Sequence, residues 1–108
     1  MKIYDYTTAG GKNLIRSYID DLSAPAKAEI YAVRQLIADE GLEAFPLLTT
    51  RQLYKKLWEI KISQERLMYV IQNQDSVFFL HICKKQKGKA EKQELEKAKK
   101  RAKAEGLL

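Results

Sequence analysis

The chain has 108 residues, a formal net charge of +6 and a single cysteine. This length predicts one domain over residues 1–108 with a modest hydrophobic core, and one cysteine excludes an internal disulfide. No apolar run approaches the roughly 18 residues that span a bilayer. The first residues, MKIYDYTT, lack the apolar segment of a signal peptide. We therefore expect a cytoplasmic protein with no membrane partner.

The positive charge is concentrated at the C-terminal end. Residues 1–83 contain ten Lys or Arg and ten Asp or Glu, whereas residues 84–108 contain ten and four. A basic segment attached to a neutral body is typical of proteins that bind nucleic acid, an acidic partner or an anionic membrane surface. The membrane alternative is disfavoured, because this segment lacks the bulky apolar face of an interfacial helix.

The first forty residues predict one strand followed by two helices. Alternating polar and apolar residues over 2–7 indicate the strand. Apolar residues at helical spacing predict a helix from a cap at Asn13 to about Asp21, and a second helix that begins after Ser23 and stops at Gly41. Because the turn between them is short, the two helices should form an antiparallel hairpin.

The sequence from residue 42 to residue 105 predicts a sheet and a final helix. Pro46 prevents a simple helix over 42–51, which predicts a loop or an edge strand. Three strand-length apolar segments with polar breaks between them then predict an antiparallel meander: Leu57–Ile62, Leu67–Gln72 and Ser76–Cys83. A lysine-rich helix over 90–105 follows, with an apolar stripe of only Leu95, Ala98 and Ala102. The order predicts a small α+β domain with a mainly antiparallel sheet, an N-terminal helical hairpin on one face and a basic C-terminal helix.

Residue parity divides the meander into two faces, because successive side chains of a strand point to opposite sides. One parity is wholly apolar and predicts the buried face: Trp58, Ile60, Ile62, Leu67, Tyr69, Ile71, Phe78, Leu80 and Ile82. The other parity carries Lys61, Arg66, His81 and Lys85. We expect these four basic residues on the opposite, open face of the sheet.

Two interpretations of the four basic residues remain open. Charged residues occupy the solvated side of most one-sided antiparallel sheets, and parity does not determine the cross-strand register. However, a lysine, an arginine, the only histidine and another lysine form a combination that suits a polyanionic ligand. The chain has no glycine-rich phosphate loop, no paired-carboxylate site and no Cys/His cluster, so no metal or cofactor is expected.

Metal-free RNA cleavage is a reaction that such groups can perform. The 2′-hydroxyl attacks the adjacent phosphate, and the enzyme must move two protons and stabilise charge on the phosphate. Arg66 could clamp the phosphate through its planar fork, and His81, with an ordinary pKa of about 6.5, could be acid or base. Lys61 and Lys85 would add positive charge, or one of them could be the base. Lys84, at the strand end, could also bind phosphate.

Each of these side chains also has a plainer interpretation. His81 could be a strand histidine that is hydrogen-bonded at the sheet surface, and Arg66 could be a hairpin charge paired with Glu65 or Glu59. Cys83 is expected to be a small buried or half-buried thiol, with an exposed catalytic nucleophile as the alternative.

Several short motifs resemble the RelE/ParE superfamily of bacterial toxins, especially its HigB-like, phage-derived branch. The motifs are L-x-x-K-L-W-E-I-K from Leu53, then E-R-L-M-Y-V, then F-F-L-H-I-C-K-K, and a final helix with E-x-x-K-A-x-x-R. The resemblance implies a RelE-like domain that acts as a ribosome-dependent mRNA interferase. It also implies a cognate antitoxin as partner, often a helix-turn-helix DNA-binding protein.

The resemblance assigns roles to individual positions. Lys61 stands where the family has a strand arginine, Arg66 matches its second-strand arginine, and Lys84 and Lys85 match its double lysine. Further RNA contacts are expected from Lys87, Lys89 and Arg101. No threonine-proline or tyrosine follows the double lysine here, which leaves the acid and the base unassigned.

Two other functions remain open. A ParE-like toxin would have the same fold but would inhibit DNA gyrase and cleave nothing. A nucleic-acid-binding module would take its affinity from the basic C-terminal segment.

Overall fold

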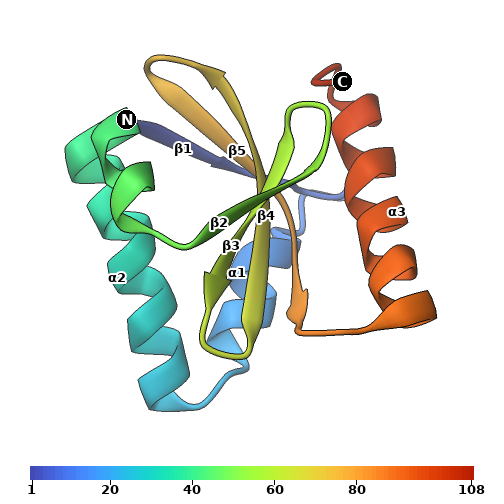
Figure 1. Cartoon of the computed structure of the whole chain (residues 1–108), viewed down its shortest axis with the longest axis horizontal. Coiled ribbons are helices and arrows are strands. Elements are labelled where there is room, and N and C mark those ends of the chain that lie inside the picture. Colours follow the sequence, from blue (N-terminus) through green and yellow to red (C-terminus); the bar gives the residue numbers. More distant parts are fainter.

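The computed structural model describes residues 1–108 and has an α+β architecture in which one sheet lies between α2 on one side and α3 on the other (Figure 1). The elements in chain order are β1 (Lys2–Asp5), α1 (Leu14–Asp20), α2 (Ala24–Glu40), the 3₁₀-helix η1 (Gly41–Leu47), β2 (Thr50–Tyr54), β3 (Leu57–Ile62), β4 (Glu65–Asn73), β5 (Ser76–Lys84) and α3 (Gly88–Ala104). The predicted fold class, helical hairpin and basic C-terminal helix are confirmed. None of the helices combines the length and apolar composition needed to cross a membrane.

The five strands form one sheet in the order β1-β5-β4-β3-β2. The predicted meander is β3-β4-β5, and its neighbours pair antiparallel. Two strands extend it at the edges: β2 pairs antiparallel with β3, and β1 pairs parallel with β5. The parallel pair is possible because α1, α2 and the meander separate β1 from β5 along the chain.

The main core lies between the sheet and the pair α1 and α2. Its buried members come from both helices, from Ala44 of η1 and from one face of the strands: Ile15, Ile19, Ile30, Ile37, Ala44, Ile60, Ile62, Leu67, Tyr69, Val77, Phe79 and Ile82. Trp58 lies on this face but remains 36% exposed in a groove beside η1. The predicted burial of Trp58 is therefore only partly correct.

A second core covers the other face, so the prediction of an open face is wrong. α3 packs there with Leu95, Ala98 and Ala102 against Leu57, Met68 and Val70 of the sheet. Alanines let the helix approach closely, and the three sheet residues supply an apolar patch between the basic ones. Gly88 begins this helix with a φ of 59°, a left-handed conformation that favours glycine.

A β-bulge in β5 changes which of its side chains are buried in the main core. Met68 pairs with His81 and Tyr69 pairs with Phe79, which leaves Leu80 unpaired. The extra residue reverses the parity on one side of the bulge. Phe79 is therefore buried in the main core, whereas Phe78 and Leu80 pack on the α3 side, opposite to the prediction.

A buried ion pair joins β1 to α2. Arg34 donates from Nη1 and Nη2 to the two carboxylate oxygens of Asp5, each at 2.8 Å, and Asn13 Nδ2 donates to the same carboxylate at 3.0 Å. The guanidinium of Arg34 also lies 5.2 Å from the centre of the Phe79 ring. Both charged side chains are less than one-tenth exposed. This cluster fixes the start of the chain against the centre of the main core.

Asn13→Ala is expected to lower the free energy of unfolding by about 1–2 kcal/mol, because Asn13 Oδ1 accepts from the backbone N–H of Arg16 and caps α1. Ser23 holds the same position at α2, but its side chain makes no capping hydrogen bond. Ser23→Ala should therefore change the free energy by less than about 0.5 kcal/mol. Urea denaturation measures both changes, and equal losses would contradict the assignment.

Candidate functional site

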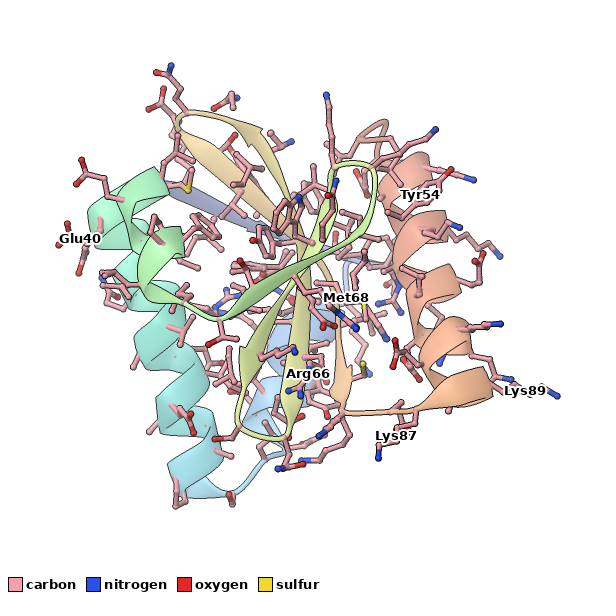
Figure 2. The ribbon with its side chains drawn as sticks, in the orientation of Figure 1. Glu40, Tyr54, Arg66, Met68, Lys87 and Lys89 are labelled. Atoms are coloured by element: carbon pink, nitrogen blue, oxygen red, sulfur yellow. The ribbon has the colours of Figure 1, made fainter.

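A small pocket lies between the sheet and the first turns of α3, next to the β3–β4 hairpin. Its volume is about 100 Å³, and its wall carries more basic than acidic groups. Figure 2 shows two of its residues, Arg66 and Met68, on β4. The complete lining is Arg51, Glu59, Lys61, Arg66, Met68, Cys83, Lys84, Lys85, Gln86, Glu91 and Glu94. β2, β3, β4, β5 and α3 all contribute to this charged pocket.

Lys61 and Arg66 are directly opposite each other in the β3–β4 pair, where side chains start about 5 Å apart. Neither forms an ion pair with a carboxylate. Like charges directly opposite each other destabilise an antiparallel pair. An anion bound between Lys61 and Arg66 would remove this repulsion.

The hairpin backbone orients Arg66. Its Nη1 donates to the carbonyl oxygens of Ser63 at 3.0 Å and Glu65 at 2.8 Å. The interpretation of Arg66 as the partner of a Glu65 or Glu59 carboxylate is therefore wrong. Nε and Nη2 make no hydrogen bond within the chain and remain available to a ligand. The backbone N–H of Lys85 donates to the carbonyl oxygen of Gln64 at 2.7 Å, and Lys85 also lines the pocket.

Lys84 lines the pocket but is already paired. Its ammonium donates to the carboxylate of Glu65, which also accepts a hydrogen bond of 2.6 Å from the hydroxyl of Tyr18. Glu65 is buried, whereas the Lys84 side chain is 55% exposed. Because Glu65 neutralises the positive charge of Lys84, Lys84 would attract an anion less strongly than Lys61 and Arg66.

His81 lies on the same face as Lys61 and Arg66, but α3 covers it and leaves it 7% exposed. Arg101 Nη1 donates to His81 Nδ1 at 3.0 Å, so the ring hydrogen is on Nε2, which donates to the carboxylate of Glu94. Burial lowers the pKa of His81, the hydrogen bond to Glu94 opposes this, and the charge of Arg101 lowers the pKa further. His81 is therefore a neutral imidazole with a hydrogen bond at each ring nitrogen, and it does not line the pocket.

The other predicted RNA contacts separate into two groups. Arg101 faces the sheet: its Nη1 also donates to the carbonyl of Leu80 at 3.0 Å, and its guanidinium lies 4.8 Å from the centre of the Tyr6 ring. Lys87 and Lys89 are exposed at the start of α3 (Figure 2). The structure brings Lys61, Arg66, Lys84 and Lys85 together, with Lys87 and Lys89 beyond the pocket and Arg101 behind His81.

The sequence did not assign four charged residues of the pocket to the site: Arg51, Glu59, Glu91 and Glu94. Arg51 Nε lies 2.9 Å from Glu59 Oε2, and Arg51 Nη2 lies 3.3 Å from Glu91 Oε1, so one arginine links the sheet to α3. A segment predicted as loop or edge strand gave Arg51 no assigned face. Glu91 and Glu94 continue the helical stripe of Leu95 and Ala98, and that spacing was the available signal for them.

His81, Cys83 and Glu94 form a cluster of possible metal ligands, with ligand atoms within 4.8 Å of one another. Metal binding through His81 Nε2 requires a hydrogen on Nδ1. That atom instead accepts from Arg101. The hydrogen bonds therefore describe a neutral imidazole bonded to a carboxylate, and they do not favour a metal site.

Cys83 is expected to react slowly with thiol reagents in the folded protein. It is 8% exposed, and burial beside Glu94, Glu59 and Glu65 raises the pKa of its thiol from 9.0 to about 12. Three pKa units leave on the order of a thousandfold less thiolate. Reaction with a chromogenic disulfide at pH 8 should be at least ~100-fold slower than in the urea-unfolded chain. Equal rates would contradict the burial of this thiol.

Comparison with known proteins identifies a family. The family model described as "Phage derived protein Gp49-like (DUF891)" matches residues 17–103, from α1 to the last turn of α3. No curated protein matches the chain. The family is associated with toxin–antitoxin systems, and it implies a cognate antitoxin as a partner. The chain belongs to the Gp49-like family of phage-derived proteins.

Proposed function

We propose that this protein is a RelE/HigB-like toxin of a type II toxin–antitoxin pair and that it cleaves mRNA on the ribosome, in the cytoplasm, without a metal ion. The observation that carries the proposal is the pair Lys61 and Arg66, two opposed cations without carboxylate partners in a concave site. Such a pair is unfavourable in the free protein and favourable once a phosphate lies between the two groups.

The charged pocket supplies groups for the phosphate in the transition state. Arg66 would donate from Nε and Nη2 to phosphate oxygens, while its Nη1 stays bound to the hairpin carbonyls. Lys61 and Lys85 would stabilise the additional negative charge that develops as the 2′-oxygen attacks. Lys84, Lys87 and Lys89 would contact neighbouring phosphates along the strand. Arg101 is not included, because its donors face His81 and Leu80.

The antitoxin would cover the charged pocket. An exposed basic site attracts an acidic or amphipathic segment, and a helix-turn-helix DNA-binding protein with such a segment is the proposed partner. Co-expression with the product of a neighbouring gene tests this partner. We expect the two proteins to copurify and the growth defect to disappear. Failure of neighbouring products both to copurify and to restore growth would contradict the proposed pair.

The test of cleavage is a map of transcript 5′ ends after induced expression in a bacterium. Wild-type protein should create new ends within translated regions, and Arg66→Ala should not. Arg16→Ala is the matched control, because Arg16 is an exposed arginine on α1, on the other side of the sheet. Growth arrest without new ends would contradict cleavage and direct attention to DNA topology, as for a gyrase inhibitor.

A further inference from the structure

Glu94 is the carboxylate in the charged pocket that is positioned by a neutral partner. Glu59 is 2% exposed and lies against Arg51, and Glu91 is paired with the same arginine. Glu94 instead accepts from His81 Nε2 through one oxygen, Oε2. Its other oxygen, Oε1, lies 3.7 Å from the ammonium of Lys97, a side chain that is 59% exposed and held weakly.

We infer that Glu94 is the general base of the proposed RNA cleavage and that His81 and Arg101 are positioning residues that act through it. This inference rests on the proposed function. The ionised carboxylate would accept the proton of the 2′-hydroxyl while the 2′-oxygen bonds to phosphorus. The 5′-oxygen would leave with the electron pair of the broken bond and take up a proton from solvent water. Lys61, Arg66 and Lys85 line the same pocket and would hold the phosphate there.

The hydrogen bonds from Arg101 to His81 and from His81 to Glu94 form a chain in which each residue donates to the next one toward the pocket. Arg101 donates to the carbonyl of Leu80 and to His81 Nδ1, which selects the Nε2–H tautomer. His81 then donates to Glu94, which lines the pocket. A buried imidazole with both nitrogens engaged cannot reach a substrate, but it can fix the rotamer of a carboxylate that does.

Electrostatics keeps this carboxylate ionised. Burial opposes ionisation of Glu94, but the hydrogen bond from His81 and the positive charge of Lys97 outweigh it and lower the pKa of Glu94. The charged and titratable groups around Glu94 come from every neighbouring element: Arg51 of β2, Glu59 and Lys61 of β3, Arg66 of β4, the neutral His81 and Cys83 with Lys84 of β5, Lys85 after it, and Glu91, Lys97 and Arg101 of α3. A carboxylate among so many cations is in the proton-accepting form at neutral pH.

Three substitutions separate a base at Glu94 from a base at His81. Glu94→Gln keeps an acceptor for His81 but removes the base, so single-turnover cleavage of ribosome-bound mRNA should fall by about 10²–10⁴-fold. His81→Gln can donate to Glu94 and accept from Arg101 without titrating, so it should retain activity within about tenfold. His81→Leu should lose more activity than His81→Gln, because the donor to Glu94 is gone.

The pH profile gives a readout that a purely structural role would not change. The active form is the ionised carboxylate, so the rate falls as pH drops through the pKa of Glu94. Removing the His81 hydrogen bond raises that pKa, and the acidic limb of the His81→Leu profile should move to higher pH than in wild type. His81→Gln should keep the wild-type limb.

Glu96→Gln is the matched control, since Glu96 is on α3 with a side chain that is 69% exposed and pairs only with Lys99. It should cleave at the wild-type rate. Glu94→Gln within threefold of wild type, or His81→Gln as inactive as Glu94→Gln, would overturn the inference alone. A wild-type protein that cuts nothing would instead overturn the proposed function, and the inference with it. Urea denaturation of each variant verifies that it is folded.

Discussion

Arg66→Ala is expected to lower the single-turnover rate of mRNA cleavage on programmed ribosomes by about 10²–10³-fold. The loss is large because Nε and Nη2 of Arg66 are free for the phosphate while Nη1 is fixed by two hairpin carbonyls. Arg66→Lys retains the charge but has no planar fork, so it should recover no more than roughly a tenth of the wild-type rate.

Two control measurements make the Arg66 experiment specific. Arg16→Ala removes the same charge from the surface of α1 and should leave the rate unchanged. The free energy of unfolding of Arg66→Ala should remain within about 1 kcal/mol of wild type, because the hairpin retains its backbone hydrogen bonds. A wild-type rate for Arg66→Lys would show that charge alone suffices and would contradict the bidentate contact.

Arg34→Met is expected to lower the free energy of unfolding by about 3–5 kcal/mol, because it leaves the Asp5 carboxylate buried without its cation. The substitution also removes the contact of the guanidinium with the Phe79 ring. Urea denaturation by circular dichroism measures the change.

The double variant Asp5→Leu, Arg34→Met distinguishes two causes of the loss: the buried Asp5 carboxylate without its cation, and the lost packing of the Arg34 side chain. Apolar residues of similar size often replace a buried ion pair with little loss, so the double variant should be much more stable than Arg34→Met alone. A double variant as unstable as the single one would contradict this explanation. It would indicate that the shape of the arginine, and not the charge of Asp5, determines the loss.

Local periodicity was sufficient to predict most of the elements. The ends of the first two helices and the strands of the meander follow from apolar spacing, from cap-type residues at Asn13 and Ser23, and from polar breaks of hairpin length. The parallel pairing of β1 with β5 is a contact between distant segments, and no local pattern indicates it. The bulge at Leu80 could not be predicted either, because the apolar run of β5 is equally compatible with a regular strand.

The candidate site was predictable in part. Parity correctly placed Lys61, Arg66 and His81 on one face, because they lie on the regular side of the bulge. What covers that face depends on tertiary packing: a stripe of one leucine and two alanines was enough for α3 to dock on it. Docking changed the environment of His81 from open to buried and brought Glu94 to the pocket. Residue type alone could not assign those environments.

The most direct test of RNA cleavage by the 2′-oxygen uses an mRNA that carries a single 2′-deoxynucleotide at the position cut by the wild-type protein. Attack by the 2′-oxygen requires that hydroxyl, so we expect this substitution to abolish the cut, and the unmodified RNA to yield a 2′,3′-cyclic phosphate. Undiminished cleavage of the deoxy substrate, or products with a 3′-hydroxyl, would contradict attack by the 2′-oxygen.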